Sequence, residues 1–214
     1  MSLRMESLVK AIEEAKKIAK PRRFVQSYEL IIKLRDVDTK RPENRFSELV
    51  ALPNPPPRKL SKVAVIADGD MALKAREAGA DLVITREELE KIAGSKKEAK
   101  KVAKAFDAFL AQADLMPVVG RLIGRYLGPR GKMPQPVPPS ADLKAFIDRA
   151  KRSVRVRLRD QPLTMCRIGA EDQNPKEVAE NAMAVLNFLL NRFKPQNIER
   201  VYVKLTMGPP VRVV

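Results

Sequence analysis

The segment LPNPPPRK, residues 52–59, contains four prolines within the five positions 53–57. Each proline fixes its own φ angle and lacks an amide hydrogen, so such a run cannot continue through a helix or a central strand. A proline-rich segment instead forms a stiff, extended connector. One set of elements must therefore end before this segment and another begin after it. We expect it to be one of two places where the chain crosses between domains.

Residues 61–152 alternate between apolar runs and helical patterns. KVAVIAD (62–68) and DLVIT (81–85) are short apolar runs, and DAFLAQ (107–112) is a third candidate strand. Helical sequence such as 70–80 separates them. Uninterrupted apolar strands that alternate with helices are typical of a parallel sheet with helices on both faces. This part of the chain is therefore expected to form an α/β domain of three layers.

The outer segments, 1–60 and 153–214, follow a different pattern. FVQSYELIIKLRDV (24–37) alternates apolar and polar residues, which indicates a half-buried strand. Residues 5–19 and 175–194 have the spacing of amphipathic helices, the second with a proline in its first turn. We expect these two segments to form one α+β domain, with helices on an antiparallel sheet, which the α/β domain interrupts.

The chain carries a large excess of positive charge. It has 42 Lys and Arg against 26 Asp and Glu, a formal net charge of +16 and a pI of about 10.1. An excess of this size predicts a polyanionic partner, either RNA or DNA. A generally charged, heat-tolerant surface is the alternative, but it would favour balanced rather than one-sided charge. No apolar run of about 18 residues is present, so we expect no membrane association.

Two features of the composition restrict the chemistry. The sequence has no histidine, which removes the commonest general base, every Ser-His-Asp arrangement and most catalytic zinc sites. Its single cysteine, Cys166, excludes an intrachain disulfide and a zinc knuckle built from Cys pairs. That cysteine usage is typical of a reducing cytoplasm. Carboxylate or lysine catalysis stays open from composition alone.

The stretch GRLIGRYLGPRGKMPQPVPP, residues 120–139, is rich in glycine, proline and cations. It matches neither the GxxxxGK[ST] phosphate loop nor the GxGxxG dinucleotide turn. Its glycines fall at helical spacing, and each costs a helix about 1 kcal/mol relative to alanine. We interpret them as permitting close approach of a neighbouring element, followed by a proline-stiffened turn. The alternative is that Arg130 and Lys132 contact phosphate or the other domain.

A second candidate site is IADGDM, residues 66–71. Asp68, Gly69 and Asp70 follow a predicted strand and could hold a metal ion or a ribose. The simpler interpretation is a turn with an aspartate N-cap before a helix.

The third candidate is KLTMGPPVRVV, at the end of the chain. A strand here leads to Thr206, Met207 and Gly208, and two prolines then end it. A methionine thioether can lie on a sugar or base, a threonine hydroxyl can bond a ribose hydroxyl, and glycine admits close backbone approach. The alternative is an ordinary turn at the end of a strand.

Four segments together resemble the large-subunit ribosomal protein L-one family, in its archaeal-type branch. They are LGPRGKMPQPVP (127–138), AQADLMPVVGR (111–121), FVQS (24–27) and VYVKLTMGP (201–209). The resemblance covers nearly the whole chain. It implies an α+β domain made from both termini and interrupted by a Rossmann-like insert.

The resemblance also implies a function. A member of this family binds large-subunit rRNA as part of the cytoplasmic ribosome and forms the mobile stalk that assists release of deacylated tRNA from the exit site. Many members also repress translation of their own mRNA by binding a leader that mimics the rRNA site. Such a protein is not an enzyme and needs no cofactor, metal or small-molecule substrate.

In the family the terminal domain makes the main RNA contact. The positions of this sequence that match the family's rRNA-binding motif are Phe24, Ser27, Thr206, Met207 and Gly208. On charge alone we add Arg22, Arg23, Lys204 and Arg212. Arg130 and Lys132 are assigned a secondary contact with tRNA or between domains. The proline-rich connector departs from the glycine-containing linker that relatives often carry, and because proline stiffens a connector, the resemblance does not fix the amplitude of interdomain motion.

Two other functions have to be separated from this one. A nucleotide-binding α/β protein would bind ATP or a dinucleotide on the sheet of the insert. A non-specific basic nucleic-acid binder would bind duplex DNA as well as RNA.

Overall fold

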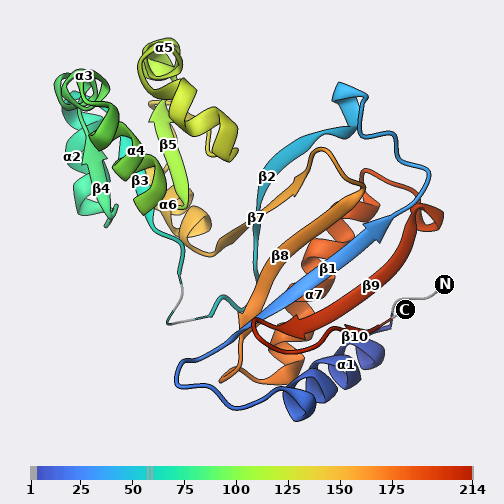
Figure 1. The fold of residues 1–214 in the computed structure, drawn as a ribbon. Coiled ribbons are helices and arrows are strands. Elements are labelled where there is room, and N and C mark those ends of the chain that lie inside the picture. The colour runs from blue at the N-terminus through green and yellow to red at the C-terminus, as the bar shows by residue number, and fades with distance from the viewer. Residues whose placement is uncertain (1–3, 57, 59, 214) are drawn as a thin grey trace. The chain divides into compact units, whose positions relative to one another are not determined.

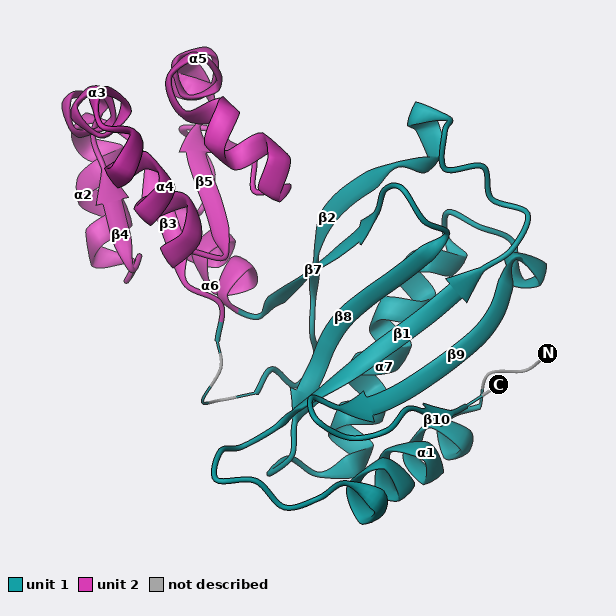
Figure 2. Cartoon of the chain, in the orientation of Figure 1, with its two compact units in different colours: residues 1–60, 152–214 teal, residues 61–151 magenta. Residues whose placement is uncertain are grey.

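The computed structural model describes residues 4–56, 58 and 60–213, so Pro57 and Lys59 of the predicted connector lie outside the described residues. The chain divides into two compact units (Figure 2). Unit 1 consists of residues 1–60 and 152–214, and unit 2 consists of residues 61–151. The predicted fold class, an α+β unit interrupted by an α/β unit, is confirmed by the elements described below.

Unit 1 contains a four-stranded antiparallel sheet (Figure 1). Its strands are, in spatial order, β10 (Val211–Arg212), β9 (Ile198–Leu205), β1 (Ser27–Leu34) and β8 (Leu163–Ala170). β1 lies between β8 and β9 and runs antiparallel to both. Alternate residues of β1 are buried, which is the half-buried pattern that the sequence predicts.

Two helices cover one face of this sheet. They are α1 (Met5–Ile18) and α7 (Pro175–Leu190), and their buried residues form one core with the strands. The side-chain oxygen of Asn174 accepts the amide hydrogen of Lys176 at 3.0 Å and so caps the start of α7. The helix ends at Leu190, four residues before the predicted end.

A two-stranded antiparallel ribbon extends unit 1. It pairs β2 (Phe46–Ala51) with β7 (Ser153–Leu158), in register from Phe46 opposite Leu158 to Ala51 opposite Ser153. Phe46 anchors the ribbon on α7, because its ring meets the Phe188 ring edge to face at 5.7 Å. The ribbon therefore shares the core of the larger sheet.

Unit 2 is built on a parallel sheet. The strand order is β4 (Leu82–Ile84), β3 (Val63–Ile66), β5 (Ala108–Gln112) and β6 (Gln135–Val137). Every residue of β3 is buried, as expected for a strand covered on both faces.

Five helices form the outer layers of unit 2. α2 (Gly69–Glu77) and α6 (Leu143–Lys151) pack together on one face of the sheet. The other face carries α3 (Arg86–Gly94), α4 (Lys96–Ala105) and α5 (Met116–Leu127), whose apolar residues share a core with β3 and β5. Short 3-10 turns occupy Pro42–Asn44, Ala113–Leu115, Gly128–Arg130 and Pro195–Asn197.

Strand β6 was not predicted, since its sequence lies within the proline-rich part of the 120–139 stretch. It pairs with β5 at the edge of the sheet, where Pro136 stands opposite Ala111. An edge strand bonds on one side only, so proline can be accommodated there. The edge position is a property of the whole sheet, which local sequence does not reveal.

The interpretation of the α5 glycines as packing residues is wrong. A Cβ atom built on Gly120 or on Gly128 would meet nothing within 4 Å, and one on Gly124 would meet only the backbone oxygen of Val119 at 3.9 Å. Among the described residues of unit 2, no element approaches these positions closely enough to require glycine. α5 forms regardless because Val119, Ile123, Tyr126 and Leu127 are buried against the sheet.

Candidate nucleic-acid interface

Three segments far apart in the sequence meet at one end of the unit 1 sheet (Figure 1). They are the loop 19–26 before β1, the turn 171–174 after β8 and the turn 206–210 after β9. Their contact follows from register, because Ser27 lies opposite Ala170 on β8 and Tyr28 lies opposite Leu205 on β9. The predicted residues Phe24, Ser27, Thr206, Met207 and Gly208 all belong to this end, and we call them the Thr206 patch.

Thr206 is joined to Ser27 through both backbone and side chain. Its amide donates to the Ser27 carbonyl oxygen at 3.0 Å, and its Oγ1 accepts the Ser27 amide hydrogen at 3.1 Å. Oγ1 also lies 3.3 Å from the Ser27 carbonyl oxygen, to which its hydroxyl donates. The hydroxyl therefore holds the patch together and retains one acceptor lone pair for an outside partner.

Gln26 is fully buried and links all three segments. Its Oε1 accepts the amide hydrogen of Met207 at 3.1 Å, and its Nε2 donates to the carbonyl oxygen of Lys20 at 3.4 Å. Its backbone amide donates to the Glu171 carboxylate at 3.2 Å, and its carbonyl oxygen accepts the Glu171 amide hydrogen at 2.9 Å. The bond from Gln26 thus holds the backbone of Met207 from the buried side of the turn.

Glu171 is a second support that the sequence did not point to. Its carbonyl oxygen accepts from the Lys16 ammonium at 3.1 Å, which ties α1 to the same turn. Tyr28 is fully buried nearby, and its pKa is raised to about 12 by desolvation and, second, by the charge of Glu171. Tyr28 therefore stays a neutral phenol at any physiological pH.

Two large apolar side chains project from this supported backbone. Phe24 is 53% exposed and Met207 is 57% exposed. Gly208 allows the turn to lie against the end of α1, since a Cβ there would meet Ala19 Cβ at 3.3 Å. A rigid backbone with exposed apolar groups can receive bases or sugars at low entropic cost.

The cations predicted to surround the patch have different environments. Arg22 and Arg23 are exposed in the loop before β1, and Arg212 is exposed on β10. Lys204 is largely covered, because its ammonium donates to the Thr206 carbonyl oxygen at 2.9 Å and lies 3.6 Å from the Glu29 carboxylate. Lys204 consequently supports the patch as well as adding charge.

The secondary candidates lie in unit 2, where both side chains bond to backbone. Arg130 donates to the Tyr126 carbonyl oxygen at 3.0 Å. The Lys132 ammonium donates to the carbonyl oxygens of Ala103 and Phe106 at 3.1 and 2.5 Å, which closes the end of α4. A contact of either residue with tRNA or with the other unit stays a prediction.

The Asp68 turn also has a structural role. Asp68 precedes α2 without a side-chain capping bond, and its carboxylate instead accepts the Arg86 amide hydrogen at 2.8 Å, joining the ends of β3 and β4. Within residues 4–56, 58 and 60–213, His, Cys, Asp and Glu form no group of three or more that could hold a metal ion. In that same part of the chain, no helix is long and apolar enough to cross a membrane.

The sequence carried a signal for Gln26, a residue that supports the patch but was not among the predicted site residues. Gln26 shares its strand face with Phe24, Tyr28 and Leu30, so it is a polar residue on the apolar side of the alternation. A buried polar side chain of this kind needs partners. Glu171 had no comparable signal, because it lies in a turn where polar residues are common.

Comparison with known proteins is consistent with this arrangement. The model of the Ribosomal protein L1p/L10e family matches residues 11–209. Large ribosomal subunit protein uL1 of Thermofilum pendens is 61% identical over 208 residues, which cover 97% of this chain and 92% of that protein. The protein of the same name from Archaeoglobus fulgidus is 51% identical over 211 residues, 98% of each chain. The resemblance predicted from the sequence is confirmed, and the chain belongs to the Ribosomal protein L1p/L10e family, a family of ribosomal proteins and not of enzymes.

Proposed function

We propose that this protein is a constituent of the large subunit of the cytoplasmic ribosome and binds rRNA through unit 1, residues 1–60 and 152–214. The observation that carries the proposal is the Thr206 patch, in which exposed Phe24 and Met207 stand on a backbone held by Gln26 and Ser27. The formal charge of +16 supports a polyanionic partner.

Affinity and recognition have separate sources in this mechanism. The cations Arg22, Arg23, Lys204 and Arg212 attract phosphates, so binding should weaken with salt. Met207 and Phe24 contact bases or sugars, and the remaining lone pair of Thr206 Oγ1 accepts from a ribose hydroxyl. Because the patch is rigid, it loses little conformational freedom when RNA binds. No covalent chemistry takes part.

We further infer that the protein forms the mobile stalk that assists release of deacylated tRNA from the exit site, and that it represses translation of its own mRNA. Relatives named as proteins of the large ribosomal subunit support a place in that subunit, and both roles are inferred from the family resemblance. For repression, the mRNA leader would bind the same Thr206 patch. Arg130 and Lys132 are proposed as the secondary contact with tRNA or between the units.

Substitution of the patch tests rRNA binding. Met207→Asp places a carboxylate where RNA phosphates and bases are expected, and Thr206→Ala removes the two hydrogen bonds of the Thr206 hydroxyl to Ser27 while the backbone bond between these residues remains. We expect the affinity of the full chain for large-subunit rRNA to fall at least about tenfold in each variant, on the order of 1.4 kcal/mol. Filter binding of rRNA fragments measures it.

Lys10→Gln is the matched control, because it removes one exposed charge from α1. It should bind rRNA nearly as the unaltered chain does. Folded Met207→Asp protein with unchanged affinity would remove the patch from the proposal. Equal competition by duplex DNA at moderate salt would indicate a non-specific binder, and heat released on adding ATP would indicate a nucleotide-binding protein. Co-sedimentation with ribosomes and a reporter carrying the protein's own leader test the two cellular roles.

A further inference from the structure

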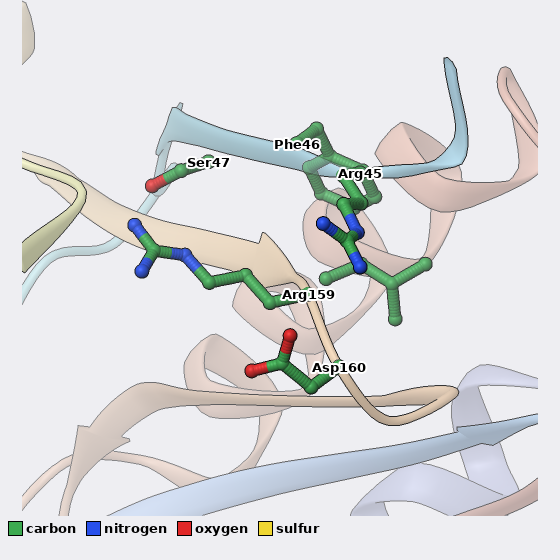
Figure 3. Close-up of a pocket in the computed structure, with 6 residues that line it drawn as sticks. Arg45, Phe46, Ser47, Arg159 and Asp160 are labelled. Carbon is green, nitrogen blue, oxygen red and sulfur yellow. The ribbon is translucent and has the colours of Figure 1, made fainter. Parts of the chain in front are cut away.

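Two adjoining hollows lie at the opposite end of unit 1 from the Thr206 patch. The first, about 390 Å³, is lined by Arg45, Phe46, Ser47, Leu158, Arg159 and Asp160. The second, about 420 Å³, is lined by Arg157, Arg159, Asp160, Gln161, Leu163 and Met165. Because Arg159 and Asp160 line both, we call the pair the Arg159 groove. Figure 3 shows Arg45, Arg159 and Asp160 around the first hollow.

The walls of the groove are held by hydrogen bonds to backbone carbonyl oxygens. They come from the start of β2, the end of β7 and the turn that leads to β8. The Thr39 hydroxyl donates to the Asp160 carbonyl oxygen at 3.1 Å, and the Leu34 amide donates to the Pro162 carbonyl oxygen at 2.8 Å. Arg45 donates its Nε hydrogen to the Thr39 carbonyl oxygen at 2.6 Å. The cations therefore project from a fixed frame.

The lining favours a nucleic-acid strand. Three arginines, Arg45, Arg157 and Arg159, line the groove together with one acidic residue, Asp160. Guanidinium forks match phosphate oxygens in geometry and charge. Met165, 54% exposed, adds a polarizable apolar surface on which a base can lie. Cations that follow a backbone beside a surface for bases are the features of single-strand binding.

The groove is separate from the Thr206 patch. β1 and β8 each contain eight residues between the two ends of the sheet, and a strand rises about 3.3 Å per residue. The two surfaces are consequently about 25 Å apart. A nucleotide bound at Met207 cannot also occupy the Arg159 groove.

We propose that the Arg159 groove is a second RNA site, which binds two or three nucleotides of an unpaired RNA strand. Phosphates bind Arg45, Arg157 and Arg159, and a base lies on Met165. The Gln161 amide offers hydrogen bonds to a ribose 2′-hydroxyl, which favours RNA over DNA. A duplex does not fit this role, since its bases are stacked inward and cannot reach Met165. The site does not depend on the proposed rRNA contact of the Thr206 patch.

Fluorescence anisotropy of the full chain with 5′-fluorescein hexauridylate and hexaadenylate tests the site. Arg159→Gln should weaken binding of both at least about fivefold and lower the slope of log affinity against log salt by about 0.7, the contribution of one phosphate on a single strand. Arg45→Gln should act in the same direction. Met207→Asp should leave oligonucleotide affinity within about twofold while it lowers rRNA affinity at least about tenfold, so the two proposals can fail separately.

Lys10→Gln again supplies the control for loss of one charge. Equal effects of Arg159→Gln and Lys10→Gln would overturn the proposal, because binding would then follow net charge alone. It would also be overturned if an RNA duplex, hexathymidylate or hexaglutamate competed with hexauridylate as well as unlabelled hexauridylate does. Circular dichroism and the midpoint of urea unfolding establish whether each variant is folded. If Arg159→Gln does not fold, the oligonucleotide affinity of Arg45→Gln tests the proposal instead.

Discussion

At the scale of single residues, the interface depends on side chains that an outside partner cannot reach. Gln26 is fully buried, yet it bonds the amide of Met207 and the carbonyl oxygen of Lys20. Met207 is the exposed side chain that we propose to contact RNA, and the bond from Gln26 determines the position of its backbone. A substitution at Gln26 should therefore act through the position of Met207 rather than through a lost RNA contact.

Tyr28, also buried, gives a test in alkaline solution. Its hydroxyl has no hydrogen-bond partner among the described residues, and burial, then Glu171, raises its pKa from 10.0 to about 12. The neutral phenol is favoured in the folded state. The protonated Tyr28 therefore contributes fully to the free energy of unfolding below pH 10. Up to about 3 kcal/mol of that free energy is lost as the pH rises through 12.

We expect Tyr28→Phe to match or exceed the unaltered chain in unfolding free energy at pH 7, since an unsatisfied hydroxyl is removed. Between pH 10 and 12 the unfolding free energy of Tyr28→Phe should decline less steeply than that of the unaltered chain. Burial also raises the pKa of Cys166 to about 12, but that thiol is present in both proteins, so the difference isolates Tyr28. Urea titrations across pH 7–12 measure it, and parallel pH curves would contradict the assignment.

At the scale of elements, the glycines of α5 and Gly169 of β8 have opposite surroundings. The glycines of α5 have open space where a Cβ would stand, whereas a Cβ on Gly169 of β8 would lie 2.8 Å from Cγ2 of the buried Val178 and 3.0 Å from Oε1 of Gln173. Sequence alone suggested packing for the α5 set because of its spacing. Close approach is decided by the neighbouring element, which spacing does not specify.

Gly120→Ala should therefore stabilise unit 2 by about 0.5–1 kcal/mol, since it lowers the entropy of the unfolded chain without a clash. Gly169→Ala should destabilise unit 1 by about 1–3 kcal/mol through overpacking against α7. Chemical denaturation followed by hydrogen exchange of each unit resolves the two effects. A loss of stability in Gly120→Ala would show that the open face of α5 is occupied.

Local pattern predicted the elements that bury a continuous face, such as β1, β3 and α7. It failed at β6, where the edge position makes Pro136 acceptable. For the interface, resemblance supplied Thr206 and Met207, but the Arg159 groove was not foreseen. Arg45 and Arg159 are more than a hundred positions apart, and only the pairing of β2 with β7 brings them together.

At the scale of the whole molecule, the chain leaves and re-enters unit 1 at neighbouring residues. Leu52 donates its amide hydrogen to the Arg152 carbonyl oxygen at 3.0 Å, directly beyond the last rung of the β2–β7 ribbon. Unit 2 begins and ends in the same way, with Ser61 bonded to Lys151 at 3.0 Å. Each unit therefore satisfies its own backbone hydrogen bonds at the points where the chain passes between the units.

This closure predicts that unit 1 folds without the insert. Asn54 is anchored on α7, where its carbonyl oxygen accepts from Asn181 at 2.6 Å, so residues 55–151 can be replaced by a short flexible Gly-Ser linker that joins Asn54 to Arg152. We expect a cooperative unfolding transition and rRNA affinity within about tenfold of the full chain. Circular dichroism and filter binding measure both, and an unfolded product would show that unit 1 needs the insert.

The same crossing determines how the protein responds to mechanical load. Both strands of the β2–β7 ribbon lead toward unit 2 from the same end. A pull on the insert therefore loads first the Asn54 contacts with α7 and the Leu52–Arg152 bond, and then the residue pairs one after another from Ala51 and Ser153. Strands loaded at opposite ends would have to break all their rungs together. Between this ribbon and the Thr206 patch lies the rest of the unit 1 sheet, in which β1 is paired on both sides. We therefore expect the ribbon to open one residue pair at a time under tension, before the sheet that carries the Thr206 patch is disturbed.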